Sequence, residues 1–251
     1  MFPVARPARV PLCLAPLVMT ALALTGLLAP GSKAQGAPPP HDHHHHHAPA
    51  SPDGPGPAPA ATMGHQHGAS LGPAGTTYDL RWLDAMVQHH TGALRMGEFV
   101  FDIGQGGVGA LAKAIWADQA QEIKAMGQWR KAWYPEAPLY PVAWKSGGDP
   151  NALADLVRMT PEQIEAMRMV GAAPSRESRV RWFLEGMIAH HGGALEMAHD
   201  ALQKSSNTTI RRQARQIIVA QRREILALRR MLRHDGLVKP EYFQYDALFS
   251  F

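Results

Sequence analysis

The residues of this chain with the clearest potential for chemistry are histidines and methionines in two copies of one motif. The copies are Met86-Val87-Gln88-His89-His90-Thr91-Gly92-Ala93-Leu94-Arg95-Met96 and Met187-Ile188-Ala189-His190-His191-Gly192-Gly193-Ala194-Leu195-Glu196-Met197. They lie 101 positions apart, as His89 and His190 show. Each copy keeps two methionines and two histidines, whereas a repeat kept only for packing would keep its apolar positions alone. Imidazole and thioether groups bind soft and borderline metals, so metal binding is the first function that the duplication suggests.

Helical spacing places these side chains on one face. Because each residue of a helix advances about 100° around the axis, the ligand types of each copy fall within an arc of about 120°. This stripe is predicted to face the protein interior. Adjacent histidines diverge, so His89 and His90 need not bind one ion, and closer pairs are Met86 with His90 and His89 with Met86 or Met96. Gly92 beside the stripe would permit close approach of another helix.

Four long helices are expected to carry these motifs, because apolar residues recur at helical spacing and no convincing period-two strand appears anywhere. They span about 77–103, 108–134, 175–204 and 207–236, the first ending at a glycine-rich break and the last at Gly236, a left-handed cap. Residues 135–150 are expected to form a loop. Short helices are expected to begin at Asp149-Pro150 and at Thr160-Pro161-Glu162-Gln163, a capping box.

The second and fourth long helices also repeat, with an offset of 102. The matching residues are Ile115, Gln119, Glu122 and Ile123 in the first copy and Ile217, Gln221, Glu224 and Ile225 in the second. The repeating unit is therefore a helical hairpin, and the predicted fold is an all-α, four-helix bundle with pseudo-twofold symmetry.

Polar side chains in this second repeat point into the apolar face of their helices. Burying the Glu122 and Glu224 carboxylates is costly unless they are paired, and the four histidines are the obvious partners. We expect Gln119, Glu122, Gln221 and Glu224 to orient the imidazoles rather than to bind metal themselves. A structural alternative is that buried histidines bonded to these groups fix the register of the bundle. Four duplicated histidines with methionines one turn away favour metal ligation, although methionine also packs well in cores.

Two further features of the helices receive structural interpretations. The Glu-x-x-His spacing of Glu196 and His199 has no counterpart in the first copy, so we interpret it as coincidental. One side of the last helix is predicted to be a solvated cationic surface, with contact to an anionic lipid or partner as a minority alternative. Its residues are Arg211, Arg212, Arg215, Arg222, Arg223, Arg229, Arg230 and Arg233.

Residues 1–34 are predicted to be a signal peptide. Arg6 and Arg9 precede an apolar run from 10 to 29, and Ser32-Lys33-Ala34 offers small residues for cleavage. The only cysteine lies within this run, so the mature protein would have no disulfide and would depend on its core. We expect a periplasmic or secreted protein, with membrane contact only through an uncleaved leader. The net charge of +4 is mild, and we expect no nucleic-acid partner.

Residues 35–75 are rich in Pro, Ala and Gly and are predicted to be a disordered arm preceding the duplicated bundle at 76–251. The arm carries a second set of metal-binding groups, suited to divalent copper, nickel or zinc. They are His41, His43, His44, His45, His46, His47, Met63, His65 and His67.

The doubled Met-x-x-His-His-x-Gly-Ala-x-x-Met, each copy followed by a helix with Gln-x-x-Glu-Ile, resembles a bacterial family called "domain of unknown function 305". Members of this family include secreted copper-binding proteins of the CopM type. The resemblance covers about residues 77–236 and implies a ferritin-like four-helix bundle, an extracytoplasmic location and a role in copper binding or resistance. Carried over by position, it implies the metal-site candidates Met86, His89, His90, Met96, Met187, His190, His191 and Met197.

The predicted function is therefore extracytoplasmic metal binding, most of all copper sequestration, delivery or resistance, with a metal-handling protein as a further partner. Thioether and imidazole groups suit Cu(I) in the bundle, and the histidine arm suits Cu(II), although other divalent metals fit both. A first alternative is a ferritin-like metal-dependent oxidase, which would need Glu122 and Glu224 together with Asp84 and Glu185. A second is a structural or interaction bundle without metal. We assign no catalytic residues, and the two copies could form two sites or share one.

Overall fold

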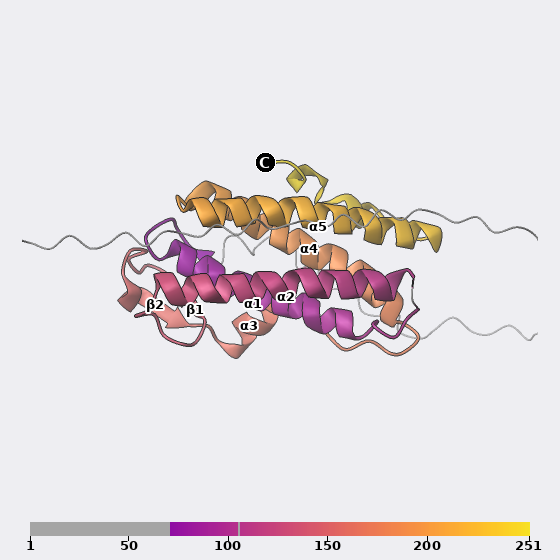
Figure 1. Ribbon diagram of the computed structural model, residues 1–251, viewed down its shortest axis with the longest axis horizontal. Coiled ribbons are helices and arrows are strands. Elements are labelled where there is room, and N and C mark those ends of the chain that lie inside the picture. Colours follow the sequence, from indigo (N-terminus) through magenta and orange to yellow (C-terminus); the bar gives the residue numbers. More distant parts are fainter. Residues whose placement is uncertain (1–70, 105) are drawn as a thin grey trace, which may run out of the picture. The chain divides into compact units, whose positions relative to one another are not determined.

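The computed structural model describes residues 71–104 and 106–251. This part of the chain is mostly helical, with α1 (Tyr78–Glu98), α2 (Val108–Trp133), α3 (Pro161–Arg168), α4 (Arg179–Lys204) and α5 (Thr208–His234) as its α-helices (Figure 1). The four long helices lie where the sequence predicted them, with each end at the predicted residue or up to five residues inside it. The predicted leader and nearly all of the predicted arm lie outside the described residues.

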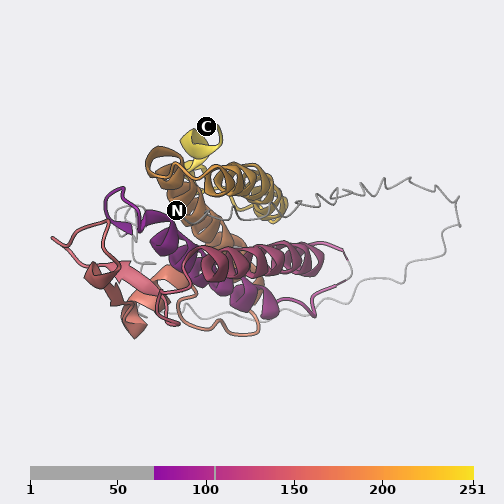
Figure 2. The same ribbon diagram turned by 60° about the vertical axis from the view of Figure 1, so that its left-hand side comes forward.

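The long helices form two hairpins that meet through α1 and α4. Figures 1 and 2 show α2 beside α1 and α5 beside α4, and α1 also contacts α4 and α3. Trp82 at the start of α1 hydrogen-bonds the backbone of Met197 near the end of α4, and Met96 at the end of α1 contacts Gly186 near the start of α4. The two helices therefore run antiparallel, with their duplicated motifs side by side.

Helix α1 is the most enclosed element of the described chain, because α2, α3, α4 and a short strand all pack around it. Its side chains are buried on nearly every side, including those of Leu80, Trp82 and Leu83, which are fully inaccessible. Helix α5 is buried mainly on one side, where Ile217, Ile225 and similar residues pack on α4. The elements that carry the duplicated histidines thus lie at the centre of the core.

A two-stranded antiparallel sheet was missed by the sequence analysis. Strand β1 (Val142–Trp144) pairs with β2 (Leu156–Arg158), with Val142 opposite Arg158, so the prediction that no strand occurs was wrong. Three residues are too few to show a period-two pattern. Strand β1 is fixed by tertiary contact instead, because the Val142 amide donates to the Asp84 carboxylate of α1 at 2.9 Å.

The helix predicted to begin at Pro150 is also absent, since residues 149–152 form turns that lead into a short 3₁₀ turn, η2 (Leu153–Asp155). The carbonyl of Pro150 accepts hydrogen bonds from the amide and the hydroxyl of Thr77, at 3.2 and 2.7 Å. Asp149 accepts a bond from the Asn151 amide at 2.9 Å. Residues 149–151 thus tie the middle of the chain to the start of α1.

Two predicted helix ends are confirmed. The Thr160 hydroxyl accepts from the Gln163 amide while the Gln163 side chain accepts from the Thr160 amide, which is a complete capping box. At the end of α5, Gly236 has φ 72°, and the Gly236 and Leu237 amides bond the carbonyls of Arg233 and Leu232. This is a Schellman motif, which needs the left-handed conformation that glycine adopts freely.

The arginine face of α5 is not simply a solvated surface, contrary to the prediction. Arg229 is 5% exposed, forms an ion pair with Asp246 and lies over the ring of Phe243, 4.6 Å from its centroid. Arg211 donates to the carbonyls of Leu202 and Ser205 at the α4–α5 turn. Part of the face therefore holds the C-terminal segment, which contains the 3₁₀ turns η3 (Pro240–Phe243) and η4 (Asp246–Leu248).

No helix between residues 71 and 251, position 105 aside, combines the length and the apolarity that a membrane span requires.

Candidate metal-binding site

The histidines and methionines of both motifs lie in the interior, on the stripe that the helical wheel predicted. All four histidines have no exposed surface, and the four methionines are at most 1% exposed. Helix α1 supplies Met86, His89, His90 and Met96, and helix α4 supplies Met187, His190, His191 and Met197. The antiparallel contact of α1 with α4 brings the two sets together.

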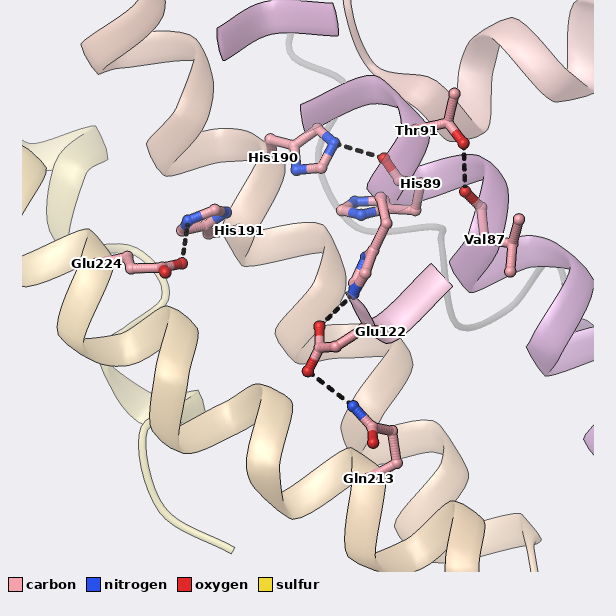
Figure 3. A network of polar contacts seen from close by, with 9 residues as sticks. Val87, His89, Thr91, Glu122, His190, His191, Gln213 and Glu224 are labelled. Atoms are coloured by element: carbon pink, nitrogen blue, oxygen red, sulfur yellow. Dashed lines mark hydrogen bonds and ion pairs between the residues drawn. The ribbon is translucent and has the colours of Figure 1, made fainter. Parts of the chain in front are cut away.

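His89 and His190, which occupy equivalent positions in the two copies, lie against each other with their rings tilted. Their ring centroids are 3.8 Å apart with 46° between the planes, and His190 Nε2 lies 2.9 Å from the His89 carbonyl oxygen (Figure 3). The first histidines of the two motifs therefore meet at one place, between α1 and α4.

The second histidine of each motif turns outward to a carboxylate on the neighbouring helix. His90 Nε2 lies 2.7 Å from Glu122 Oε2 on α2. His191 Nε2 lies 2.7 Å from Glu224 Oε2 on α5 (Figure 3). The rings within each adjacent pair are 6.2 and 6.1 Å apart, so adjacent histidines diverge as predicted. The carboxylate side chains are 22% and 15% exposed, so they separate the buried imidazoles from solvent.

The surroundings of the two His–Glu pairs differ. Glu122 Oε1 accepts a hydrogen bond of 2.7 Å from Gln213 of α5. The residue that matches Gln213 in the first copy is Leu111. Gln213 was missed by sequence reasoning, because its position is not duplicated. Burial and the nearby Glu224 and Glu122 carboxylates raise the pKa of Asp118, which places a third carboxyl group near both pairs.

Gln119 and Gln221 are each 2% exposed, and neither makes a side-chain hydrogen bond to any residue that the structure describes. They were predicted to orient imidazoles, but no hydrogen bond joins them to a histidine. A buried amide without a partner costs about 1–3 kcal/mol, so such groups call for an explanation, often a water or an ion. Both glutamines lie one turn before the carboxylates that face His90 and His191.

The two motifs offer imidazole nitrogens and thioether sulfurs as possible metal donors. Within the described residues, no three or more His, Cys, Asp or Glu side chains are arranged to hold a metal ion, so methionine sulfur would have to contribute. His90 Nδ1 and His191 Nδ1 are buried and make no hydrogen bond in this part of the chain, while each Nε2 faces a carboxylate. A carboxylate at one ring nitrogen is the usual partner of a histidine that binds metal through the other.

Comparison with protein families decides what kind of chain this is. The family model described as "Domain of unknown function (DUF305)" matches residues 79–232, which include both motifs and all four long helices. The chain belongs to the DUF305 family. No curated protein matches the chain.

Solved structures similar to this DUF305 chain include two groups. "CopM in the Cu(I)-bound form" shares 21% identity and a TM-score of 0.45, covering 62% of this chain and 96% of CopM. "CopM in the Ag-bound form (by soaking)" shares 23% identity over similar lengths, again with a TM-score of 0.45. A DUF305 fragment from Deinococcus radiodurans shares 26% identity and a TM-score of 0.45, covering 64% of this chain and 99% of the fragment.

In this DUF305 chain, elements outside the duplication cover the histidine helices. A Cβ on Gly92 would lie 1.8 Å from the Arg168 carbonyl oxygen at the end of α3, so this glycine permits the close approach that was predicted. A Cβ on Gly192 would lie 2.1 Å from the ring of Tyr245 in the C-terminal segment. Helix α3 thus lies against α1, and the C-terminal segment lies against α4, where each motif would otherwise face solvent.

An oxidase site would need the carboxylates of Asp84 and Glu185 as well, but both of these side chains pair with other residues. Asp84 forms an ion pair with Arg130 at 2.5 Å, and Glu185 accepts from Lys239 at 2.7 Å. His199 lies 3.0 Å from the Leu248 carbonyl oxygen, at the surface of α4 that faces the C-terminal segment. Neither carboxylate is a partner of the histidines, and His199 lies apart from them.

Proposed function

We propose that this DUF305 chain is an extracytoplasmic metal-binding protein that holds copper through the imidazoles and thioethers of its duplicated motif. The observation that carries the proposal is the pair of His–Glu contacts at equivalent positions, each leaving a buried Nδ1 without a hydrogen bond. Thioether and imidazole donors together favour Cu(I) over harder ions. Sequestration, delivery and copper resistance all require such a buried, reversible site.

The proposed ligands fall into three groups. His90 and His191 offer Nδ1 atoms, with Glu122 and Glu224 orienting the rings. His89 and His190 meet where the two copies join, which supports a shared central site beside two equivalent flanking ones. The methionines complete these sets as soft donors. They are Met86, Met96, Met187 and Met197.

Three finer features belong to the same proposal. The long helices α1, α2, α4 and α5 correspond to a ferritin-like four-helix bundle. The leader at 1–34 directs the protein to the periplasm or outside the cell. The histidines of the arm, from His41 to His67, capture Cu(II) or other divalent ions before the bundle receives copper, and a metal-handling protein takes the ion onward.

A competition titration with a Cu(I) chelator tests the proposal. The chain is used without its histidine arm, from residue 71, because Leu71 is 2% exposed in the core and the Gly72 carbonyl accepts a bond from Lys204. The test variant is His90→Ala with His191→Ala. The matched control is His199→Ala with His234→Ala, which removes two histidines outside the cluster. Circular dichroism checks that all variants keep their helices.

We expect tight Cu(I) binding that the control retains and that the test variant loses by at least about 100-fold. Glu122→Gln removes only the carboxylate that orients His90, and changes in such groups usually cost about 10–100-fold in metal affinity. Equal affinity of the two double variants would show that the histidines are architectural. Bound iron, or an oxidase activity that depends on copper, would instead favour the oxidase.

A further inference from the structure

The outer side of α5, which we call the exposed α5 face, carries six exposed arginines. They are Arg212, Arg215, Arg222, Arg223, Arg230 and Arg233. No other exposed position between Thr208 and His234 is an aspartate or a glutamate, and two of them are Val219 and Leu226. At 1.5 Å per residue, the arginines extend over about 32 Å of the helix. The face is therefore a long cationic surface that no acid on the helix interrupts.

The duplication shows that the bundle does not need these arginines. Helix α2 is the equivalent of α5 in the first copy, and four of the arginines are matched there by uncharged residues, Ala110, Ala120, Gln121 and Gln128. Like charges three or four residues apart on a helix repel each other, and Arg212 with Arg215 and Arg230 with Arg233 have this spacing. The exposed α5 face therefore destabilises the chain slightly, and an anionic partner would offset the repulsion.

The carboxylates beside the exposed α5 face do not neutralise it. Asp246 pairs with the buried Arg229, and Asp118 of α2 lies near Arg223. Asp235, just past the helix, lies 3.3 Å from the imidazole of the last helical residue. Three of the arginine side chains form no hydrogen bond or ion pair with any residue in 71–104 or 106–251, and these are Arg212, Arg230 and Arg233.

The chemistry of the exposed α5 face matches that of phospholipid head groups. Its cations are all arginines, whose planar guanidinium binds phosphate in a bidentate manner, whereas the exposed cations of α2 are all lysines. Val219 and Leu226 are 47% and 37% exposed and lie about two turns apart among the arginines. A soluble polyanion would use the charges alone. Arginines interspersed with exposed apolar side chains suit a lipid surface, which offers phosphates above an apolar layer.

We propose that the exposed α5 face docks this chain on a membrane surface that is rich in anionic phospholipids. The six arginines bind the lipid phosphates, and Val219 and Leu226 enter the layer just beneath them. Helix α5 lies in the plane of the surface while its other side stays packed on α4. The proposal goes beyond copper binding and does not depend on it, because none of these residues belongs to the proposed copper site.

Flotation with lipid vesicles tests the proposal. One kind of vesicle holds equal parts of phosphatidylglycerol and phosphatidylcholine, and the other holds phosphatidylcholine alone. The chain from residue 71 is used, because its buried core residues lie between Leu71 and Tyr245 and because the apolar run at 10–29 would bind vesicles by itself. We expect binding to the anionic vesicles only. It should weaken as salt is added, since salt screens exposed charges.

Matched variants separate local recognition from net charge. Arg212→Gln with Arg230→Gln should weaken binding to anionic vesicles about 30-fold, since each arginine near an anionic surface contributes about fivefold. The control is Lys113→Gln with Lys131→Gln, which removes the same charge from exposed positions of α2 and should change binding little.

A second pair of positions separates a membrane from a soluble polyanion. Val219→Ser with Leu226→Ser should weaken vesicle binding about tenfold, because less apolar area enters the lipid. The same variant should bind polyphosphate, a soluble polyanion, as the natural chain does.

A fluorescent label shows which side of the bundle meets the lipid. The only cysteine is Cys13, so the chain from residue 71 has none, and a label at Leu226→Cys reports one position. Its emission should shift to the blue with anionic vesicles. The label at Lys124→Cys, the matching position on α2, should not shift.

The proposal is overturned if both kinds of vesicle bind alike, or if the lysine variant loses as much binding as the arginine variant. It is also overturned if the serine variant binds anionic vesicles as the natural chain does, which would indicate a soluble polyanion instead. Circular dichroism confirms that each variant is folded. Copper titrations use other residues, so failure of the copper site and failure of this face remain distinguishable.

Discussion

The substitution Gly92→Ala probes how closely α3 approaches the first histidine motif. The added Cβ would lie 1.8 Å from the Arg168 carbonyl oxygen and 2.7 and 2.9 Å from the Arg168 carbonyl carbon and Cα. Ordinary van der Waals contact begins at 3.4 Å, so the end of α3 must retreat by about 1.6 Å. The obstacle is backbone, which cannot rotate away as a side chain would.

A matched control removes the effect of helix propensity. Gly127 of α2 is also helical, and a Cβ there would meet no atom within 4 Å. Alanine favours a helix over glycine by about 1 kcal/mol, so Gly127→Ala should stabilise the protein by about that amount. At Gly92 the same gain is opposed by overpacking, which costs typically about 1–3 kcal/mol. The free energy of unfolding of Gly92→Ala should therefore be about 1–3 kcal/mol below that of Gly127→Ala.

Urea unfolding followed by circular dichroism measures both values, with equal m-values as the condition for comparing them. For a domain of this size each kcal/mol corresponds to roughly 2–4 °C in Tm, so thermal unfolding gives a second estimate. If Gly92→Ala stabilises the protein as much as Gly127→Ala does, then α3 does not rest on α1 as described. The reasoning about how the first motif is covered would then be wrong.

Two further predictions concern the C-terminal segment. Gly192→Ala should destabilise the protein, because the added Cβ would overlap the ring of Tyr245. Adding Tyr245→Ala should recover part of the lost stability, since the obstacle is a side chain. A double-mutant cycle that shows no coupling between the two positions would contradict this contact. Arg229→Ala should lower the free energy of unfolding in urea by about 1–3 kcal/mol, because it leaves Asp246 unpaired and two aromatic rings uncovered. The control Arg212→Ala, at an exposed arginine, should change the free energy of unfolding by less than about 0.5 kcal/mol. Equal effects at the two arginines would argue against the buried ion pair.

The features that sequence reasoning predicted well depend on local spacing. The histidine stripe, the two hairpins and the caps at Thr160 and Gly236 follow from the helical period and from residue types within a few positions. The same spacing indicated that adjacent histidines diverge, as His89 and His90 do. We predicted that Glu122 and Glu224 face histidines, because burying an unpaired carboxylate is costly. The structure shows both contacts.

The features that could not be predicted depend on contacts between distant segments. Strand β1 exists because Asp84 of α1 accepts a bond from the Val142 amide, 58 residues later. Arg229 looked like its exposed neighbours because its partner, Asp246, belongs to a segment with no repeat and no strong pattern. Gln213 contacts Glu122 across 91 residues and has no duplicated equivalent. In each case the local pattern fits several environments, and only tertiary packing selects one.

The contact between the imidazoles of His89 and His190 bears on the origin of this protein. In a symmetric dimer, a residue on the twofold axis touches its own copy, so one change in the gene alters both sides of the contact at once. Fusion of two such hairpins into one chain frees the two sides to change separately. The contact at His89 and His190 still has the form of a self-contact, whereas Gln213 and Leu111 have already diverged. The centre of the molecule thus retains a contact between equivalent residues, while the surroundings of the two His–Glu pairs differ.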